Sequence, residues 1–371
     1  MTGSIIPAPL ARQSWPAIFI LIAIAGCGAI VLFSSAGGSL SPWAASHAIR
    51  FSIFMGLAIA LSYVDERQWK ALAFPGYAVV LVALIGVEII GGVSGGSQRW
   101  LDLGFIRLQP SELMKLFIVL ACARFFDLLP AGEIRRWNAI WIPGALIGVP
   151  AFLVMLQPDL GTGLMIVAGG LTVMFLAGLP LRLFIGAIAA LIAIVPVAFF
   201  FLLREYQQNR VLIFLNPEKD PLGTGYHITQ SKIAIGSGGI FGKGFLQGSQ
   251  SHLDYLPEGH TDFVFATMAE EWGLIGGIAI IGLFLLLFRW GMNLAGRART
   301  RFARLAAAGL TATIFFYVAI NLMMVMGLAP VVGIPLPLVS HGGTAMLTVM
   351  ICVGVLMSID RSSRPGDRGL G

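Results

Sequence analysis

The chain has 371 residues, of which 57% are hydrophobic and only 11% are charged, whereas an ordinary soluble domain has about 25% charged residues. The 24 Lys and Arg and the 18 Asp and Glu are too few to cover the surface of a soluble protein of this length. The high hydrophobicity also excludes a disordered chain. The chain is therefore expected to lie in a lipid bilayer. Because one crossing takes about 20 apolar residues, a chain of this length is predicted to form many spanning helices.

The cysteines and the N-terminal segment do not predict a disulfide, a zinc site or a cleaved signal peptide. Cys27, Cys122 and Cys352 lie far apart in apolar stretches, without a CxxC pair. Neither a disulfide framework nor a zinc site is therefore predicted. Arg12 precedes an apolar run that is too long for the core of a signal peptide, so we expect this run to stay in the protein as a first membrane span.

Ten apolar runs of spanning length follow one another, and each is predicted to form a transmembrane helix. The connections between them are short, except for residues 204–263, which contain Pro, Gly and many charges. Within that long connection, residues 226–239 are typical of a short amphipathic helix. The sequence thus predicts an all-α polytopic membrane protein with a single membrane domain over residues 1–371. The predicted spans are 15–35, 44–64, 71–90, 110–128, 138–156, 161–179, 182–203, 264–289, 304–328 and 341–359.

The basic residues orient these spans. If the N-terminus is cytoplasmic, most Lys and Arg fall in the inner connections and in the C-terminal tail, as the positive-inside rule requires. Long loops escape that rule, so the charges of residues 204–263 do not oppose this orientation. Both termini are predicted in the cytoplasm, and the large loop between the seventh and eighth helices is predicted outside. The net charge of +6 then needs no nucleic-acid partner, since it orients the chain and attracts anionic lipid.

Ionisable residues inside a bilayer are candidates for function, because a charge there costs at least a few kcal/mol, about 2.5–3.5 on insertion scales. Glu112 and Lys115 are spaced i,i+3, which places both on one face of a helix. Pro110 is a plausible first residue of that helix. Asp159 lies at a matching outer depth, where it could pair with Lys115. Two interpretations stay open here: a structural ion pair between helices, and the polar floor of a cavity that opens outward.

Asp262 lies where the large loop enters the eighth span. It follows His260 and Thr261 and precedes the apolar run FVFATMA. A carboxylate at the edge of a low-dielectric region has a raised pKa, which suits a general base. The alternative is that Asp262 is a helix N-cap. No metal-ligand spacing accompanies His260, so no metal site is predicted.

Basic residues on the outer side would suit a substrate rich in phosphate, because Arg and Lys both neutralise phosphate. Solvated loop charges are the simpler explanation for some of them. The candidates for a phosphate group are Arg99, Arg210, Lys232 and Lys243. A further stretch, residues 327–343, is rich in Pro and Gly between two spans. We expect an irregular loop there that is buried in protein or lines a cavity.

Five segments, in this order, resemble the SEDS family of cell-wall proteins (shape, elongation, division and sporulation), and its elongation members most of all. The resemblance extends from about residue 15 to residue 360. His341 departs from the family pattern, in which Tyr usually precedes the two glycines, so the contact made by this residue cannot be transferred from the family. The segments are GGSQRWLDLGFIRLQPSELMKL (95–116), QPDLGTG (157–163), NPEKDPLGTGYHITQSKIAIGSGGIFGKG (216–244), LPEGHTDFVFATMAEEWG (256–273) and GIPLPLVSHGG (333–343).

The resemblance implies a ten-span glycosyltransferase that polymerises lipid II into glycan strands on the outer side of the bacterial cytoplasmic membrane. Its expected partner is a class B penicillin-binding protein, the transpeptidase that cross-links those strands. By motif, Asp262 is expected to be the catalytic carboxylate, and Lys115 with Asp159 an interhelical pair. Glu112 is expected to be a polar residue of the cavity.

In the implied reaction, Asp262 takes the proton from the 4-hydroxyl of the acceptor sugar, which attacks the anomeric carbon of the lipid-linked donor. Undecaprenyl pyrophosphate leaves, and its developing negative charge needs cationic stabilisation. Arg99, Arg210, Lys232 and Lys243 are the candidates for this role. A divalent cation is a further candidate, and the sequence assigns no cofactor.

Two other functions fit a polytopic protein with buried charges. One is a flippase for the lipid-linked precursor, and the other is a non-catalytic scaffold for the transpeptidase. An alternating-access carrier places its site near the midplane of the membrane. Glu112, Lys115, Asp159 and Asp262 all map near the outer face instead, and this favours the transferase.

Overall fold

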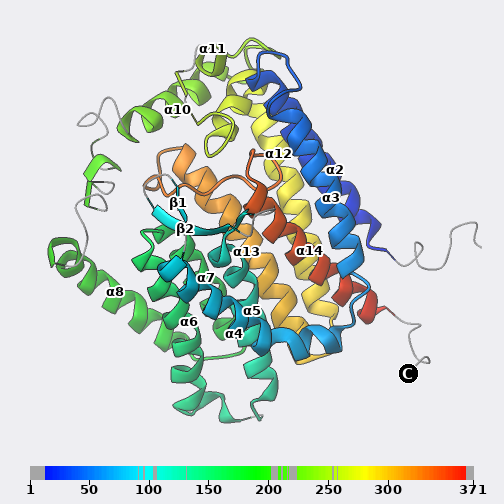
Figure 1. Cartoon of the computed structure of the whole chain (residues 1–371), viewed down its shortest axis with the longest axis vertical. Coiled ribbons are helices and arrows are strands. Elements are labelled where there is room, and N and C mark those ends of the chain that lie inside the picture. Colours follow the sequence, from blue (N-terminus) through cyan, green and yellow to red (C-terminus); the bar gives the residue numbers. More distant parts are fainter. Residues whose placement is uncertain are drawn as a thin grey trace, which may run out of the picture.

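The computed structural model describes residues 13–90, 92–94, 97–102, 107–130, 132–201, 208–209, 212–214, 216, 224–252, 255–256 and 258–364. A helix occupies each of the ten ranges where a span is predicted, with most ends shifted by five residues or fewer and the eighth helix extended by eight residues, to Arg297. Helices α10 and α11 lie between the seventh and eighth of these, and α10 covers all but the last residue of the predicted amphipathic segment (Figure 1). The helices are α2 (Trp15–Ser35), α3 (Ala44–Leu61), α4 (Glu66–Ile90), α5 (Pro110–Leu128), α6 (Asn138–Leu156), α7 (Leu160–Leu176), α8 (Leu181–Phe201), α10 (Thr224–Gly238), α11 (Ser249–His252), α12 (Val264–Arg297), α13 (Arg301–Val325) and α14 (Gly343–Ser363).

Seven helices of the described chain are long and apolar enough to cross a membrane, namely α2, α3, α4, α6, α12, α13 and α14. Helix α7 and the first part of α8 are apolar but shorter. Large apolar side chains lie exposed on the outer faces of these helices, as at Phe19, Val79, Phe152 and Ile278. Exposure of this kind suits a surface covered by lipid tails, where side chains need not be polar.

Helix α5 lies in the middle of the bundle, packed against α4, α6, α7 and α13 (Figure 1). It begins at Pro110, as predicted, with the proline in its first turn. Helix α5 is not among the seven apolar helices, because its sequence includes Glu112, Lys115, Arg124 and Asp127. Protein rather than lipid surrounds its polar residues, which explains how a charged helix is accommodated in this position.

A small antiparallel sheet joins α4 to α5, and it corrects the expectation of a purely helical chain. It has the strand order β1 (Gly92–Ser94), β2 (Ser97–Asp102) and β3 (Arg107–Leu108). Strand β2 packs against α4 and α5. Strands this short have too few residues for a reliable period-2 pattern. The sheet matters for function because β2 brings Arg99 and Trp100 to the cavity described below.

Helix α12 is broken at Gly273, whose φ of 65° and ψ of −162° are not helical. The backbone of residues 239–244, which follows α10, fills the break. The N–H groups of Leu274 and Ile275 donate to the carbonyls of residues 239 and 240 at 2.9 and 3.2 Å. In return, the N–H groups of residues 243 and 244 donate to the carbonyls of residues 270 and 271 at 3.0 and 3.1 Å. The break therefore leaves these backbone groups satisfied, as buried groups must be.

We expect Gly273→Ala to destabilise the protein, because only glycine readily adopts this backbone conformation. Strain of this kind costs about 1–3 kcal/mol, and the added Cβ would lie 2.3 Å from the backbone nitrogen of Gly242. Thermal unfolding of the detergent-solubilised protein measures the effect. Gly282→Ala in the same helix is the matched control, since its Cβ would meet nothing within 4 Å. Equal melting temperatures for the two variants would contradict the role of the break.

Candidate active site

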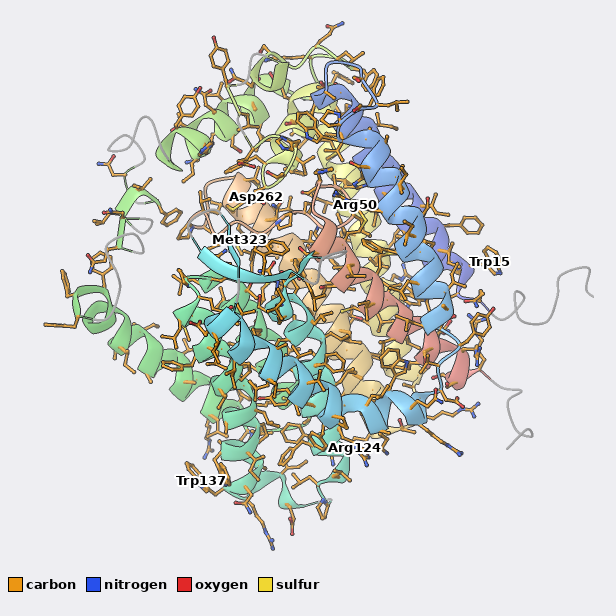
Figure 2. The ribbon with its side chains drawn as sticks, in the orientation of Figure 1. Trp15, Arg50, Arg124, Trp137, Asp262 and Met323 are labelled. Carbon is orange, nitrogen blue, oxygen red and sulfur yellow. The ribbon has the colours of Figure 1, made fainter. Side chains whose placement is uncertain are left out.

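A cavity of about 800 Å³ lies at the end of the bundle where α14 begins. Figure 2 shows Asp262 and Arg50 at this end of the molecule, and Arg124 and Trp137 at the opposite end. The volume is within the range of about 300–1,000 Å³ that is usual for ligand sites. The lining residues come from α3, β2, α5, α7, α13, α14 and the loops before α12 and α14. They are Arg50, Phe54, Arg99, Trp100, Gln109, Glu112, Lys115, Asp159, Thr162, Thr261, Asp262, Tyr317, Gly333, Ile334, Pro335, His341, Gly342, Gly343, Thr344, Ala345 and Leu347.

The innermost polar group of the cavity is formed by Glu112, Lys115 and Tyr317. The Lys115 side chain is only 1% exposed, and its ammonium donates to Glu112 Oε1 at 2.6 Å and to the Tyr317 hydroxyl at 2.8 Å. The Tyr317 hydroxyl in turn donates to Glu112 Oε2. The predicted Lys115–Asp159 pair is therefore wrong. Glu112 lies one turn earlier on the same helix, and Tyr317 of α13 provides the second acceptor.

Asp159 holds the start of α7 and meets a different cation. As the N-cap of α7, its Oδ1 accepts from the backbone N–H of Thr162 at 3.1 Å. Its Oδ2 lies 3.6 Å from Arg99 Nη1 and accepts from Gln109 Nε2 at 3.4 Å. Asp159 thus lines the cavity, and its partners come from β2 and from the residue just before α5.

Asp262 lies at the edge of the cavity, in the turn that leads into α12. The N-cap of α12 is Phe263, so the interpretation of Asp262 as an N-cap is wrong. Its backbone carbonyl accepts from Asn321 Nδ2 at 2.8 Å, and the same amide group donates to the carbonyl of Ile334 at 2.7 Å. Asn321 therefore ties the turn that carries Asp262 to the loop before α14.

The environment of the Asp262 carboxylate suits proton transfer. The side chain is half-buried, open to the cavity but otherwise surrounded by protein. Burial, assisted by the negative charge of Glu258, raises the pKa of Asp262 from 3.8 to about 6. Gly333, in the loop before α14, lies beside this carboxylate. Its φ is +70°, and a Cβ at this position would lie 3.5 Å from Asp262 Oδ2. A general base is most effective when its pKa is near the working pH.

Not all of the four predicted phosphate-binding cations line the cavity. Arg99 lines the cavity, whereas Arg210 lies outside the described residues. Lys243 pairs with Glu270 at 2.6 Å and donates to Ser249 at 2.8 Å. Lys232 is not among the cavity residues, and its side chain lies over Gly327, just beyond the end of α13. Of the three that lie in the described residues, only Arg99 is therefore brought to the cavity.

Three cavity contacts involve residues that the sequence analysis did not propose as functional. Arg50 of α3 and Asn321 of α13 are polar residues inside apolar runs. Because polar groups are costly inside a membrane, such residues are candidates for function. Tyr317 had no such signal, since tyrosine is common in spanning helices. All three are separated in sequence from the motif residues that they meet.

His341, whose contact the family pattern left open, lies against Arg50. Its Nε2 is 3.3 Å from Arg50 Nη1, and its backbone N–H donates to the carbonyl of His260 at 2.9 Å. The ring of His260 stacks on Trp43, with ring centres 4.1 Å apart. Burial, followed by the charges of Arg50 and His260, lowers the pKa of His341, so the ring is neutral at pH 7.

In the ranges that the structure describes, no group of three or more His, Cys, Asp or Glu residues is placed to hold a metal ion.

Comparisons with known proteins assign the family. The model of the FtsW, RodA and SpoVE family, described as cell cycle proteins, matches residues 15–365. The peptidoglycan glycosyltransferase MrdB of Escherichia coli strain K12 is 44% identical over 346 residues, which is 92% of each chain. Stage V sporulation protein E of Bacillus subtilis strain 168 is 36% identical over 313 residues and 84% of each chain. The peptidoglycan glycosyltransferase RodA of Treponema pallidum is 29% identical over 418 residues, covering 92% of this chain and 96% of its own.

Solved structures agree with this assignment. A chain from a structure titled as the structural coordination of polymerization and crosslinking by a peptidoglycan synthase complex matches with a TM-score of 0.82 and 32% identity, covering 95% of this chain and 99% of its own. The crystal structure of the rod shape determining protein RodA of Thermus thermophilus matches with a TM-score of 0.70 and 28% identity, covering 95% and 98%. The chain therefore belongs to the FtsW, RodA and SpoVE family, the SEDS family that its motifs resemble.

Proposed function

We propose that the protein is a peptidoglycan glycosyltransferase that polymerises lipid II into glycan strands during cell elongation. The relatives MrdB and RodA carry that enzyme name, which favours this function over transport of the precursor or a scaffold role. The observation that carries the proposal is Asp262, a half-buried carboxylate at a cavity, with its pKa raised to about 6.

The reaction is a single displacement. Asp262 accepts the proton of the acceptor 4-hydroxyl while that oxygen forms a bond to the anomeric carbon of the donor. The bond between this carbon and the pyrophosphate oxygen breaks, and undecaprenyl pyrophosphate leaves with the electron pair. Attack from the face opposite the leaving group inverts the anomeric carbon. A base within hydrogen-bond reach of the attacking hydroxyl contributes typically about 10²–10⁴-fold to the rate.

We place the protein in the bacterial cytoplasmic membrane with ten spans, both termini in the cytoplasm, and the cavity open to the outside. Basic residues at the end opposite the cavity support this orientation. Lys70 and Arg124 both pair with Asp127 near the end of α5, at 2.6 and 3.0 Å. Arg297 and Arg364 pair with Asp360 at the far end of α14. The loop 204–263 is then on the same side as the cavity.

The proposed partner is a class B penicillin-binding protein, which would cross-link the strands that this chain makes. Support comes from the similar chain described above, whose structure is titled as a complex that coordinates polymerization and crosslinking. Lipid II and the growing strand are the proposed substrates.

The pH dependence of polymerisation tests the proposed base. Because Asp262 must be ionised to accept a proton, we expect kcat/KM for lipid II to be level above pH 7. Below about pH 6 it should fall roughly tenfold for each pH unit, since the pKa of Asp262 is raised to about 6 and the kcat/KM profile reports the free enzyme. The assay uses the purified chain with its transpeptidase. An acidic limb with a midpoint near 3.8, the ordinary value for aspartate, would contradict the assignment.

A further inference from the structure

The charged residues of the cavity are not all paired. Six acidic or basic side chains line it, and four of them form two ion pairs, Lys115 with Glu112 and Arg99 with Asp159. The remaining two are Asp262 and Arg50, neither of which forms an ion pair with any residue that the structure describes. Within the described part of the chain, the cavity therefore contains one acid and one cation whose charges no ion pair neutralises.

Arg50 has donor capacity to spare. A guanidinium has five N–H donors in a planar fork, and the polar partner of Arg50 among the described residues is His341, at 3.3 Å from Nη1. Arginine can only donate, so Nε2 of the neutral His341 is the acceptor. This contact orients the guanidinium without neutralising its charge.

Unlike Arg50, Arg99 is paired with a carboxylate, and its donors are largely engaged by protein. Its Nε donates to the carbonyl of Gln157 at 3.1 Å, its Nη2 donates to the carbonyl of Pro158 at 2.5 Å, and its Nη1 faces Asp159. Three of its nitrogens are thus engaged with the connection between α6 and α7. Arg99 is suited to hold that connection in place, and it has little left to offer a ligand.

The start of α14 adds to the positive character beside Arg50. The first residues of this 21-residue helix, from Gly343 to Ala345, line the cavity. The N-cap is Gly342, which has no side chain to accept from the first N–H groups. A Cβ at Gly343 would lie 3.6 Å from Arg50 Nη1, so the guanidinium lies directly over the first turn. Free N–H groups and the helix dipole both favour an anion at such a position.

We propose that Arg50, oriented by His341 at the start of α14, binds the pyrophosphate group of the lipid-linked substrate. This inference rests on the proposed function and assigns a subsite within it. Planar guanidinium groups match phosphate geometry. During the reaction, the proton moves to Asp262 and the negative charge passes to the leaving pyrophosphate, where Arg50 and the α14 backbone stabilise it.

The test measures binding of undecaprenyl pyrophosphate to the full chain, purified with its transpeptidase partner. Trp100 lines the cavity, so its fluorescence provides a titration that does not depend on turnover. We expect Arg50→Ala to weaken binding about 10- to 100-fold, the range for one hydrogen-bonding partner of a charged group. Arg50→Lys should recover part of this loss, because it keeps the charge but not the planar fork.

Two further variants separate orientation from charge. His341→Ala should weaken binding less than Arg50→Ala, and His341→Gln should restore it, since the Gln carbonyl can accept from Arg50. Arg136→Ala is the control, because this cation is 69% exposed and pairs with Glu133, at the end of the bundle opposite the cavity. Inorganic pyrophosphate should compete with the lipid in wild type and should compete more weakly in Arg50→Ala.

The outcomes distinguish the inference from the proposed function. If wild type polymerises lipid II and Arg50→Ala binds undecaprenyl pyrophosphate as tightly as wild type, the pyrophosphate subsite is elsewhere and the function stands. If wild type does not polymerise lipid II, the proposed function fails, whatever the titration shows. If Arg50→Ala does not fold, Arg50→Lys and the two His341 variants decide the matter, and equal affinity in all three would overturn the inference.

Discussion

Replacing Asp262 by Asn is expected to lower the polymerisation rate by about 10²–10⁴-fold, the usual contribution of a general base. Asparagine has nearly the same shape but cannot accept the proton of the acceptor hydroxyl at neutral pH. The turn should keep its position, because Asn321 holds the backbone carbonyl of residue 262 rather than its side chain. The rate is measured as glycan strand formed from lipid II by the purified complex.

Stability provides the control for this variant. The pKa of Asp262 is raised in the folded protein, so the ionised side chain is less favourable there than in the unfolded chain at pH 7. Replacing it with a neutral amide should leave the melting temperature equal to or above that of wild type. Asp262→Glu should keep part of the activity. Strand formation by Asp262→Asn at the wild-type rate would show that another group is the base.

The second large effect is expected at the innermost polar group. Lys115→Met removes the cation that faces Glu112 in a site where the lysine is 1% exposed. It leaves a buried carboxylate whose remaining hydrogen-bond partner among the described residues is Tyr317. Removing one member of a buried ion pair costs about 3–5 kcal/mol. Unfolding of the detergent-solubilised protein, followed by heat or denaturant, measures this loss.

A double-mutant cycle isolates the pair itself. Glu112→Gln combined with Lys115→Met removes both charges, so the uncompensated carboxylate is gone and the double variant should be more stable than Lys115→Met alone. Tyr317 remains in both cases. Strictly additive losses from the two single substitutions would indicate that the pair does not act as a unit.

The helices could be predicted from sequence because each apolar run is close to the length that a bilayer requires. Pro110 marked the start of α5 correctly. The break at Gly273 could not be predicted in this way, since it depends on the backbone of residues 239–244 entering the helix from elsewhere in the chain. The small sheet was also missed, because strands of two to six residues have no distinctive pattern.

The site was predicted in part. Resemblance to the family motif selected Asp262. Spacing alone could not distinguish a general base from an N-cap, because Asp262 is only two residues before the start of α12 at Val264. The partner of Lys115 was wrong for a different reason. Glu112 was the nearer candidate in sequence, on the same helix as Lys115, but the choice between the two carboxylates depends on how the helices pack and on where α13 places Tyr317. Arg50 was overlooked because its partner His341 is 291 positions away.

The filled break in α12 has a consequence for which changes this chain can tolerate. Residues 239–244 and the two parts of α12 share backbone hydrogen bonds, and Cβ atoms at Gly238 and Gly242 would lie only 2.1 and 2.0 Å from carbonyl oxygens of residues 269 and 271. Insertions and deletions are usually tolerated in surface loops, but here a change of loop length would pull the helix apart. The two segments should therefore be inherited as one unit, and a chimera that exchanges only one of them should fail to fold.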